Sequence, residues 1–192
     1  MTWYTFFKFV HVLAAVLWVG GAAAVQFYAL RAMKTGEGRR MAEFAGDTEW
    51  VGMRVFTPSS ILLFLAAIGL MVNGHWPWGT LWVDYALVVF AASFAIGAGF
   101  FGPESGRIKR VIEERGVDSP EATARIRRIL LLSRAELVLL LGVIYAMVVK
   151  PTGSSGLGWA IAVAIVMAAA LGLIARGFVA SAPEASAASD AA

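Results

Sequence analysis

Cysteine is absent from the 192-residue chain, and charged side chains are scarce, at 15% of all residues. Apolar residues make up 59% of the chain, and its mean hydropathy is +0.74. A water-soluble domain usually has about 25% charged and about 45–50% apolar residues. The composition therefore predicts a membrane protein, whose main partner is the lipid bilayer.

The lack of cysteine excludes disulfides, thiolate metal sites, iron–sulfur clusters and cysteine nucleophiles. Two histidines, His11 and His75, are the only imidazoles left to act as metal ligands. Motifs of soluble catalysis, such as a glycine-rich phosphate loop or His-Glu-x-x-His, are missing as well. The net charge of +3 is spread over predicted membrane-flanking loops, so we expect no nucleic-acid partner.

Five segments are apolar and long enough to cross a membrane, which takes about 20 residues of helix. They cover about residues 3–30, 51–73, 80–101, 129–149 and 157–179. We expect an all-α membrane protein with five transmembrane helices. Residues 1–151 would form a four-helix transmembrane domain, 152–180 a fifth transmembrane helix, and 181–192 a disordered tail without aromatic or branched apolar residues.

The two longer loops, about residues 31–49 and 102–128, mix acids and bases with helix-forming residues. We expect them to be surface loops that contain short helices. One such helix is predicted to start at Ser119-Pro120 and to run into the fourth span, since proline is favoured at the first helical position.

Basic residues indicate which way the bundle points, because they accumulate in cytoplasmic loops. Of the 16 lysines and arginines, all but Lys8 and Lys150 fall on one side of the predicted bundle. With an odd number of spans, the N-terminus would lie outside and the C-terminus in the cytoplasm. The positions of the tryptophans support the same orientation, because the tryptophan ring prefers the level of the lipid headgroups. Five of the seven tryptophans fall at the predicted outer boundary: Trp3, Trp76, Trp78, Trp82 and Trp159.

The histidines predict a cofactor near the outer face. His11 lies inside the first span, about 12 Å from Trp3 by helical rise, with Lys8 one turn nearer the surface. His75 follows the second span on the same predicted side. Two imidazoles on opposite faces of one plane are what low-spin haem b requires, and Lys8 or Lys150 would meet its propionates. We expect His11 as an axial ligand, His75 as a second one, and electron transfer with a membrane quinone or redox partner.

Simpler interpretations stay open. A single transmembrane histidine often only hydrogen-bonds a neighbouring helix, and the chain would then be a cofactor-free structural or accessory membrane subunit. A third alternative is a transporter for a metal or small solute, which needs a continuous polar path from His11 to Glu136. We expect Glu136 to form an interhelical ion pair with Arg54, Arg134 or Arg176, with a proton relay as the alternative.

Small residues recur every four positions in the fifth span and form one stripe: Ala160, Ala164, Ala168 and Gly172. Small residues let helices approach closely in lipid. The stripe predicts helix packing within the chain, with a homodimer contact as the alternative.

Residues 7–21, with the sequence FKFVHVLAAVLWVGG, resemble the first helix of a bacterial family of predicted integral membrane proteins that is described only as a domain of unknown function. The similarity covers about residues 3–151 and continues at EWV (49–51), RVFTP (54–58), FGP (101–103) and MVVKP (147–151). The resemblance implies a multi-pass protein of the bacterial cytoplasmic (inner) membrane, and it implies no activity.

The spacing of His11, Trp18 and Gly20 is also similar, more distantly, to the first helix of copper-resistance-D-type proteins and of HemJ-type protoporphyrinogen oxidases. Members of the second group bind haem through a histidine in that helix, which implies the same role for His11. Spans two to four match no further functional residues of either group. Neither porphyrinogen oxidation nor copper import is therefore implied.

Overall fold

The structure is a computed structural model, and it describes residues 2–35, 46–151 and 156–179. These residues form helices and no strand. Their bounds are α1 (Trp3–Ala15), α2 (Gly21–Thr35), α4 (Thr57–Gly74), α5 (Leu81–Ile96), α6 (Gly102–Arg115), α7 (Pro120–Val149) and α8 (Gly156–Val179). Three π-helical turns make the longer helices continuous: Val16–Gly20, Gly52–Phe56 and Gly97–Phe101.

Four continuous helices are long and apolar enough to cross a membrane: Trp3–Arg31, Gly46–Gly74, Leu81–Arg115 and Pro120–Val149. This confirms the expected all-helical membrane fold with its first four spans. Helix α8 is not among these four, and the apolar stretch found in its described part is Ile161–Arg176. The fifth span therefore stays a prediction, and the predicted tail 181–192 lies outside the described residues.

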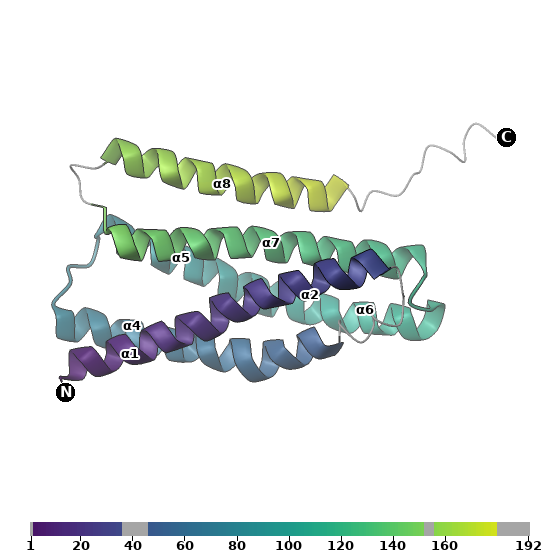
Figure 1. Ribbon diagram of the computed structural model, residues 1–192, viewed down its shortest axis with the longest axis horizontal. Coiled ribbons are helices and arrows are strands. Elements are labelled where there is room, and N and C mark those ends of the chain that lie inside the picture. Colours follow the sequence, from purple (N-terminus) through teal and green to yellow (C-terminus); the bar gives the residue numbers. More distant parts are fainter. Residues whose placement is uncertain (1, 36–45, 152–155, 180–192) are drawn as a thin grey trace.

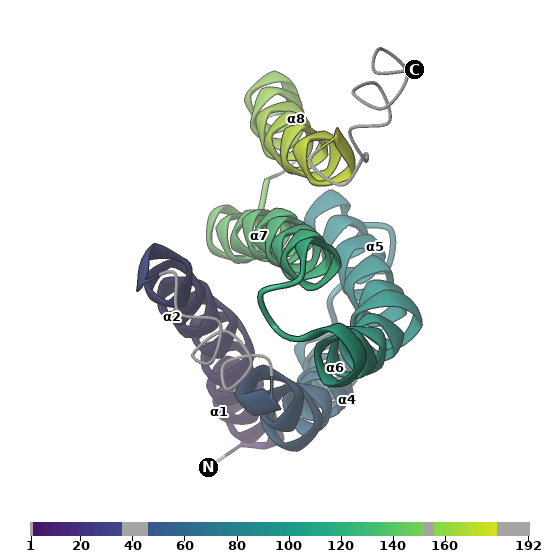
Figure 2. The ribbon, with the colours of Figure 1, turned by 90° about the vertical axis from the view of Figure 1, so that its right-hand side faces the viewer.

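The helices lie side by side along the long axis of the molecule (Figure 1), and α8 packs only on the outer side of the α5–α7 layer (Figure 2). Helix α1 packs along α4, while α7 packs against both α5 and α8. Trp3, Gly74, Leu81 and Val149 lie at one end of the bundle, which we call the N-terminal end. We call the opposite end, where α6 meets α7, the basic end.

Residues 102–128 contain helices, as expected, but they are not separate short helices in a loop. Helix α6 continues α5 directly, and only a short turn at 116–119 separates it from α7. The reason is packing, because Ile108 of α6 is buried against Ile126 and Leu130 of α7 and keeps this stretch in helical register. The predicted start at Ser119-Pro120 is confirmed, since the Ser119 hydroxyl accepts a hydrogen bond from the Ala122 amide.

The middle of the bundle is a buried apolar cluster. Trp18, Val89 and Leu140 are its buried members, drawn from the first, third and fourth spans. The ring of Phe90 meets that of Trp18 edge to face, with centroids 5.7 Å apart. Such contacts supply the close packing that holds helices together where lipid gives no hydrophobic driving force.

Candidate functional site

His11 lies in the interface between α1 and α4, and its side chain is only 8% exposed. Its Nδ1 is 3.2 Å from the carbonyl oxygen of Leu63 on α4. A carbonyl can only accept a hydrogen bond, so Nδ1 carries the hydrogen and donates it. In the neutral ring the lone pair then resides on Nε2, which is the arrangement found in metal-binding histidines and in purely structural ones.

The helices around His11 approach each other closely. A Cβ atom at Gly69 of α4 would lie 2.5 Å from the ring of Phe7, one turn before His11 on α1. No larger residue than glycine therefore fits here without displacing that ring. The His11–Leu63 hydrogen bond thus sits in a tight helix–helix contact.

His75 lies elsewhere. It caps the C-terminus of α4 in a left-handed conformation, with φ at 52°, and its side chain is exposed. Twelve residues of α4 separate it from Leu63, which corresponds to about 18 Å along the helix. The structure therefore does not bring His11 and His75 to one metal ion, and the pair does not fit the predicted bis-imidazole site.

The two predicted propionate partners are both exposed and both lie over aromatic rings. Nζ of Lys8 is 5.4 Å from the centroid of the Tyr4 ring. Nζ of Lys150 is 4.3 Å from the centroid of the Trp76 ring and 5.6 Å from that of Trp82. Lys150 thus belongs to the loop at the end of the bundle with His75, while Lys8 precedes His11 by one turn.

No group of three or more histidine, aspartate and glutamate side chains gathers to hold a metal ion in the part of the chain that the structure describes. Of the residues predicted to form one site, only His11 and Lys8 lie near each other on one helix. The site predicted from the sequence is therefore divided between the α1–α4 interface and the N-terminal end.

Glu136 does not form the expected ion pair within the described ranges 2–35, 46–151 and 156–179. It lies beside Ser93 of α5, which is a buried residue. Arg134 points away to α2, where its Nε donates to Oε1 of Gln26 at 3.1 Å. The expected pair with Arg134 does not form because Arg134 and Glu136 are two residues apart and face different sides of one helix.

Gln26 is the residue that the sequence interpretation missed. It is 7% exposed, and its Nε2 donates a hydrogen bond to the Ser133 hydroxyl while its carbonyl oxygen accepts from Arg134. This polar cluster joins the end of the first span to the fourth. The sequence could have indicated this role, because Gln26 is a polar residue inside the predicted first span, and such residues often hydrogen-bond another helix.

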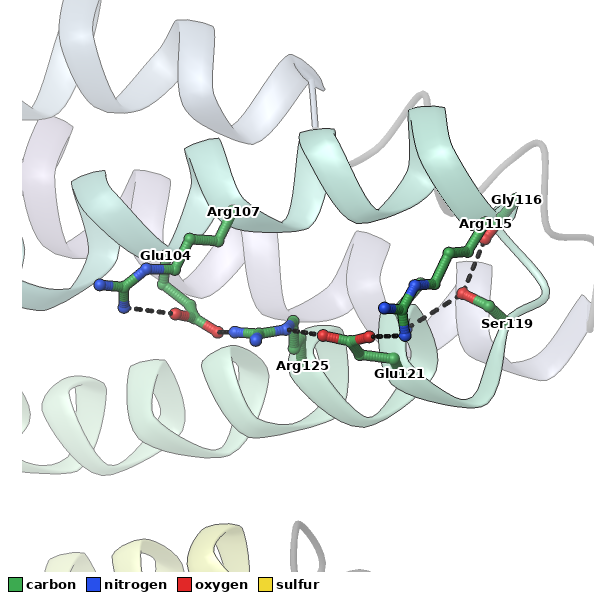
Figure 3. Close-up of polar contacts among 8 residues, drawn as sticks. Glu104, Arg107, Arg115, Gly116, Ser119, Glu121 and Arg125 are labelled. Carbon is green, nitrogen blue, oxygen red and sulfur yellow. Dashed lines mark hydrogen bonds and ion pairs between the residues drawn. The ribbon is translucent and has the colours of Figure 1, made fainter.

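The basic end holds a chain of ion pairs between α6 and α7 (Figure 3). Glu104 is 2% exposed and binds two arginines: Arg125 Nη1 at 2.8 Å and Arg107 Nη1 at 3.3 Å. Arg125 also donates through Nε to Glu121 at 3.1 Å, and Glu121 binds Arg115 at 2.6 Å. Two carboxylates thus alternate with three guanidinium groups, which leaves this cluster with a net positive charge.

The spacing of these residues explains why the helices turn back on each other here. Glu104 and Arg107 lie three positions apart on α6, and Glu121 and Arg125 lie four apart on α7, so each pair shares a helix face. The Glu104–Arg125 contact then connects the two faces. The arrangement is suited to holding the α6–α7 turn, and it contains no nucleophile or paired carboxylates for catalysis.

An all-helical fold with four apolar helices of spanning length, buried polar contacts between them and a basic end defines a multi-pass integral membrane protein. The comparison with known families agrees with this class. The chain belongs to the family described as Predicted integral membrane protein (DUF2269), which matches residues 5–151. No curated protein and no solved structure shows significant similarity to the chain.

Proposed function

We propose that the chain is a cofactor-free accessory or scaffold subunit of a membrane, whose four-helix core holds a fixed shape for partner contact. The observation that carries the proposal is the separation of the two histidines. His11 donates to Leu63 between α1 and α4, whereas its predicted co-ligand His75 caps α4, about 18 Å away along the helix.

Five spans, an outside N-terminus and a cytoplasmic C-terminus in the bacterial inner membrane belong to the same proposal. Support comes from the distribution of charge. Arg107, Arg115 and Arg125 lie together at the basic end, while the N-terminal end carries Lys8 and Lys150 and several tryptophans. The positive-inside rule then places the basic end in the cytoplasm.

Self-association through α8 is the form of partner contact that we propose. Helix α8 packs on α7 with Ala170 buried, whereas Ala164, Ala168 and Gly172 of the predicted stripe are exposed. A Cβ atom at Gly172 would meet no atom within 4 Å. The side chain of Ala160 lies outside the described residues. The stripe therefore does not pack within the chain as expected, and it leaves a smooth face on which α8 of a second copy would fit.

A redox role is the second candidate, and one observation favours it. Donation from Nδ1 to a backbone carbonyl leaves Nε2 of His11 with its lone pair, as in many histidines that bind metals. His11 would then be the single protein ligand of a haem b. Lys8, which lies nearer to His11 than Lys150 does, would bind a haem propionate. The electron partner would be a membrane quinone or a redox protein. Bound haem would supply one-electron chemistry.

A transporter is disfavoured by the packing between His11 and Glu136. Trp18 lies about 10 Å beyond His11 along the first span, and Leu140 lies about 6 Å beyond Glu136 along the fourth, toward the N-terminal end of the bundle. These two side chains meet in the buried apolar cluster. Apolar side chains therefore interrupt the polar path that transport would need.

The optical spectrum of the chain, purified in mild detergent from haem-replete cells, separates the first two candidates. An accessory subunit is colourless above 300 nm, as are aromatic side chains in general. A Soret band that disappears in His11→Ala would overturn the cofactor-free proposal and establish the redox one. Self-association is tested separately by the mass of the detergent complex, where Ala168→Leu should shift a dimer toward the monomer and an unchanged mass contradicts the α8 contact.

A further inference from the structure

An open pocket of about 500 Å³ lies at the N-terminal end of the bundle, between the start of α5 and the end of α7. Its lining includes Trp76, Pro77, Leu81, Trp82, Lys150 and Pro151. Most of this wall is apolar, and Lys150 provides its positive charge. The pocket lies where the apolar helices end, at the level that lipid headgroups occupy beside a membrane-spanning bundle.

Lys150 is held in place by the backbone and by the indoles. It caps α7 in a left-handed conformation, with φ at 47°, and its amide donates to the Ala146 carbonyl at 2.9 Å. Its ammonium group lies over Trp76 and Trp82, whose rings meet edge to face with centroids 5.5 Å apart. Indole rings attract a cation without neutralising it, so the site keeps its charge.

No carboxylate among the described residues lies within ion-pair distance of Lys150. Asp84, the nearest acid along α5, is exposed and does not line the pocket. Thr80 caps α5, and its hydroxyl donates to the Pro77 carbonyl at 2.7 Å and makes no hydrogen bond to the first turn of the helix. The N-terminus of α5 faces the same wall, and Asp84 in its first turn offsets part of the positive end of the helix dipole, so Lys150 remains the main positive charge of the pocket.

The packing behind Trp76 fixes the shape of the pocket. A Cβ atom at Gly74 would lie 2.6 Å from the indole of Trp76 and 2.8 Å from the ring of Tyr4. Glycine at this position therefore lets Trp76 lie flat against the end of α4, in reach of Lys150. Gly79, with φ at 82°, makes the turn that leads into α5.

We propose that this pocket binds the phosphate of an anionic phospholipid, with Lys150 as its cation and the indoles and prolines against the glycerol and upper acyl carbons. Phosphate is the shared chemistry of lipid headgroups and of the free ion. The apolar wall favours the lipid, because a free phosphate ion gains nothing from burying indole and proline surface, whereas a lipid does. The site is independent of whether the chain binds haem.

Native mass spectrometry of the full chain in a neutral detergent tests the proposal. We expect phosphatidylglycerol to bind more tightly than phosphatidylcholine of the same chain length. Lys150→Asn should weaken phosphatidylglycerol binding by about fivefold, the effect of one basic residue near a membrane surface. Asparagine is chosen because it tolerates the left-handed conformation. Lys150→Arg should retain binding, and Lys8→Asn is the matched control, since Lys8 lies at the same end outside the pocket.

Three results would overturn the proposal. The first is equal binding of the two lipids by the unaltered chain, which requires no variant and so holds even if Lys150→Asn fails to fold. The second is unchanged lipid preference in a Lys150→Asn variant whose melting temperature shows that it is folded. The third is displacement of phosphatidylglycerol by inorganic phosphate at equal concentration, which would assign the site to the free ion.

Discussion

The imidazole Nδ1 of His11 donates a hydrogen bond to the Leu63 carbonyl oxygen at 3.2 Å, and this contact joins α1 to α4 inside the bundle. His11 is only 8% exposed, and an unpaired polar group is costly at a buried position. The contact gives the one buried histidine a structural role that does not depend on a cofactor.

Replacing His11 by alanine should therefore destabilise the bundle. We expect a loss of about 1–3 kcal/mol, because one buried hydrogen bond and the packing of the ring are removed. His75→Ala is the matched control, since His75 is exposed, and it should change stability by less than about 0.5 kcal/mol. Thermal unfolding in detergent, followed by circular dichroism, measures both. Equal effects of the two substitutions would contradict the role of His11.

The absence of cysteine allows the topology to be read with single-cysteine variants. Thr2→Cys should react with a membrane-impermeant maleimide in intact cells, because it lies at the N-terminal end. Asp118→Cys in the α6–α7 turn should react only after permeabilisation. Ser186→Cys tests the fifth span and should behave like Asp118→Cys. Labelling of Ser186→Cys from outside would mean that α8 does not cross the membrane.

Removing the charge of Glu104 should loosen the α6–α7 turn. Glu104→Gln weakens two ion pairs at once, and we expect a loss of about 1–2 kcal/mol. The effect is limited by solvent screening, because the side chains of Arg107 and Arg125 are 57% and 33% exposed. Glu113→Gln on the exposed face of α6 is the control. Hydrogen exchange of α6 amides should rise in Glu104→Gln alone, and equal exchange in both variants would argue against the ion-pair chain.

A methyl group at Gly142 should disturb the packing of α7 against its neighbours. The added Cβ would lie 2.5 Å from the Tyr85 hydroxyl and 3.0 Å from a methyl group of Val166 on α8. We expect Gly142→Ala to cost about 1–3 kcal/mol, as overpacking does. Gly106→Ala, where nothing lies within 4 Å, should be neutral or slightly stabilising, because alanine favours helix. If Gly142→Ala is as stable as Gly106→Ala, α7 does not contact α5 and α8 in this way.

Much of the fold follows from the sequence because hydrophobic length is a strong signal in membrane proteins. The first four spans could be predicted for this reason. The start of α7 could be predicted from Ser119 and Pro120, since capping depends on local residues. The continuation of α5 into α6 could not, because the polar segment is held helical by Ile108 packing on a helix that follows later in the chain.

The predicted site shows a second limit of prediction from the sequence, which concerns contacts between helices. Spacing along one helix correctly placed Lys8 one turn from His11, but it did not fix the distance between His11 and His75. That distance depends on where α1 contacts α4, and the contact falls at Leu63, far from the helix end that carries His75. The partner of Arg134 was missed for the same reason, because Gln26 comes from another helix.

We propose that His11 holds α1 against α4 and does not ligate haem. Titration of haemin into the detergent-purified chain and into His11→Ala, followed at the Soret band, tests it most directly. The account predicts a weak, non-saturating response that is the same in both proteins. A saturable response at one haemin per chain that His11→Ala lacks would contradict it.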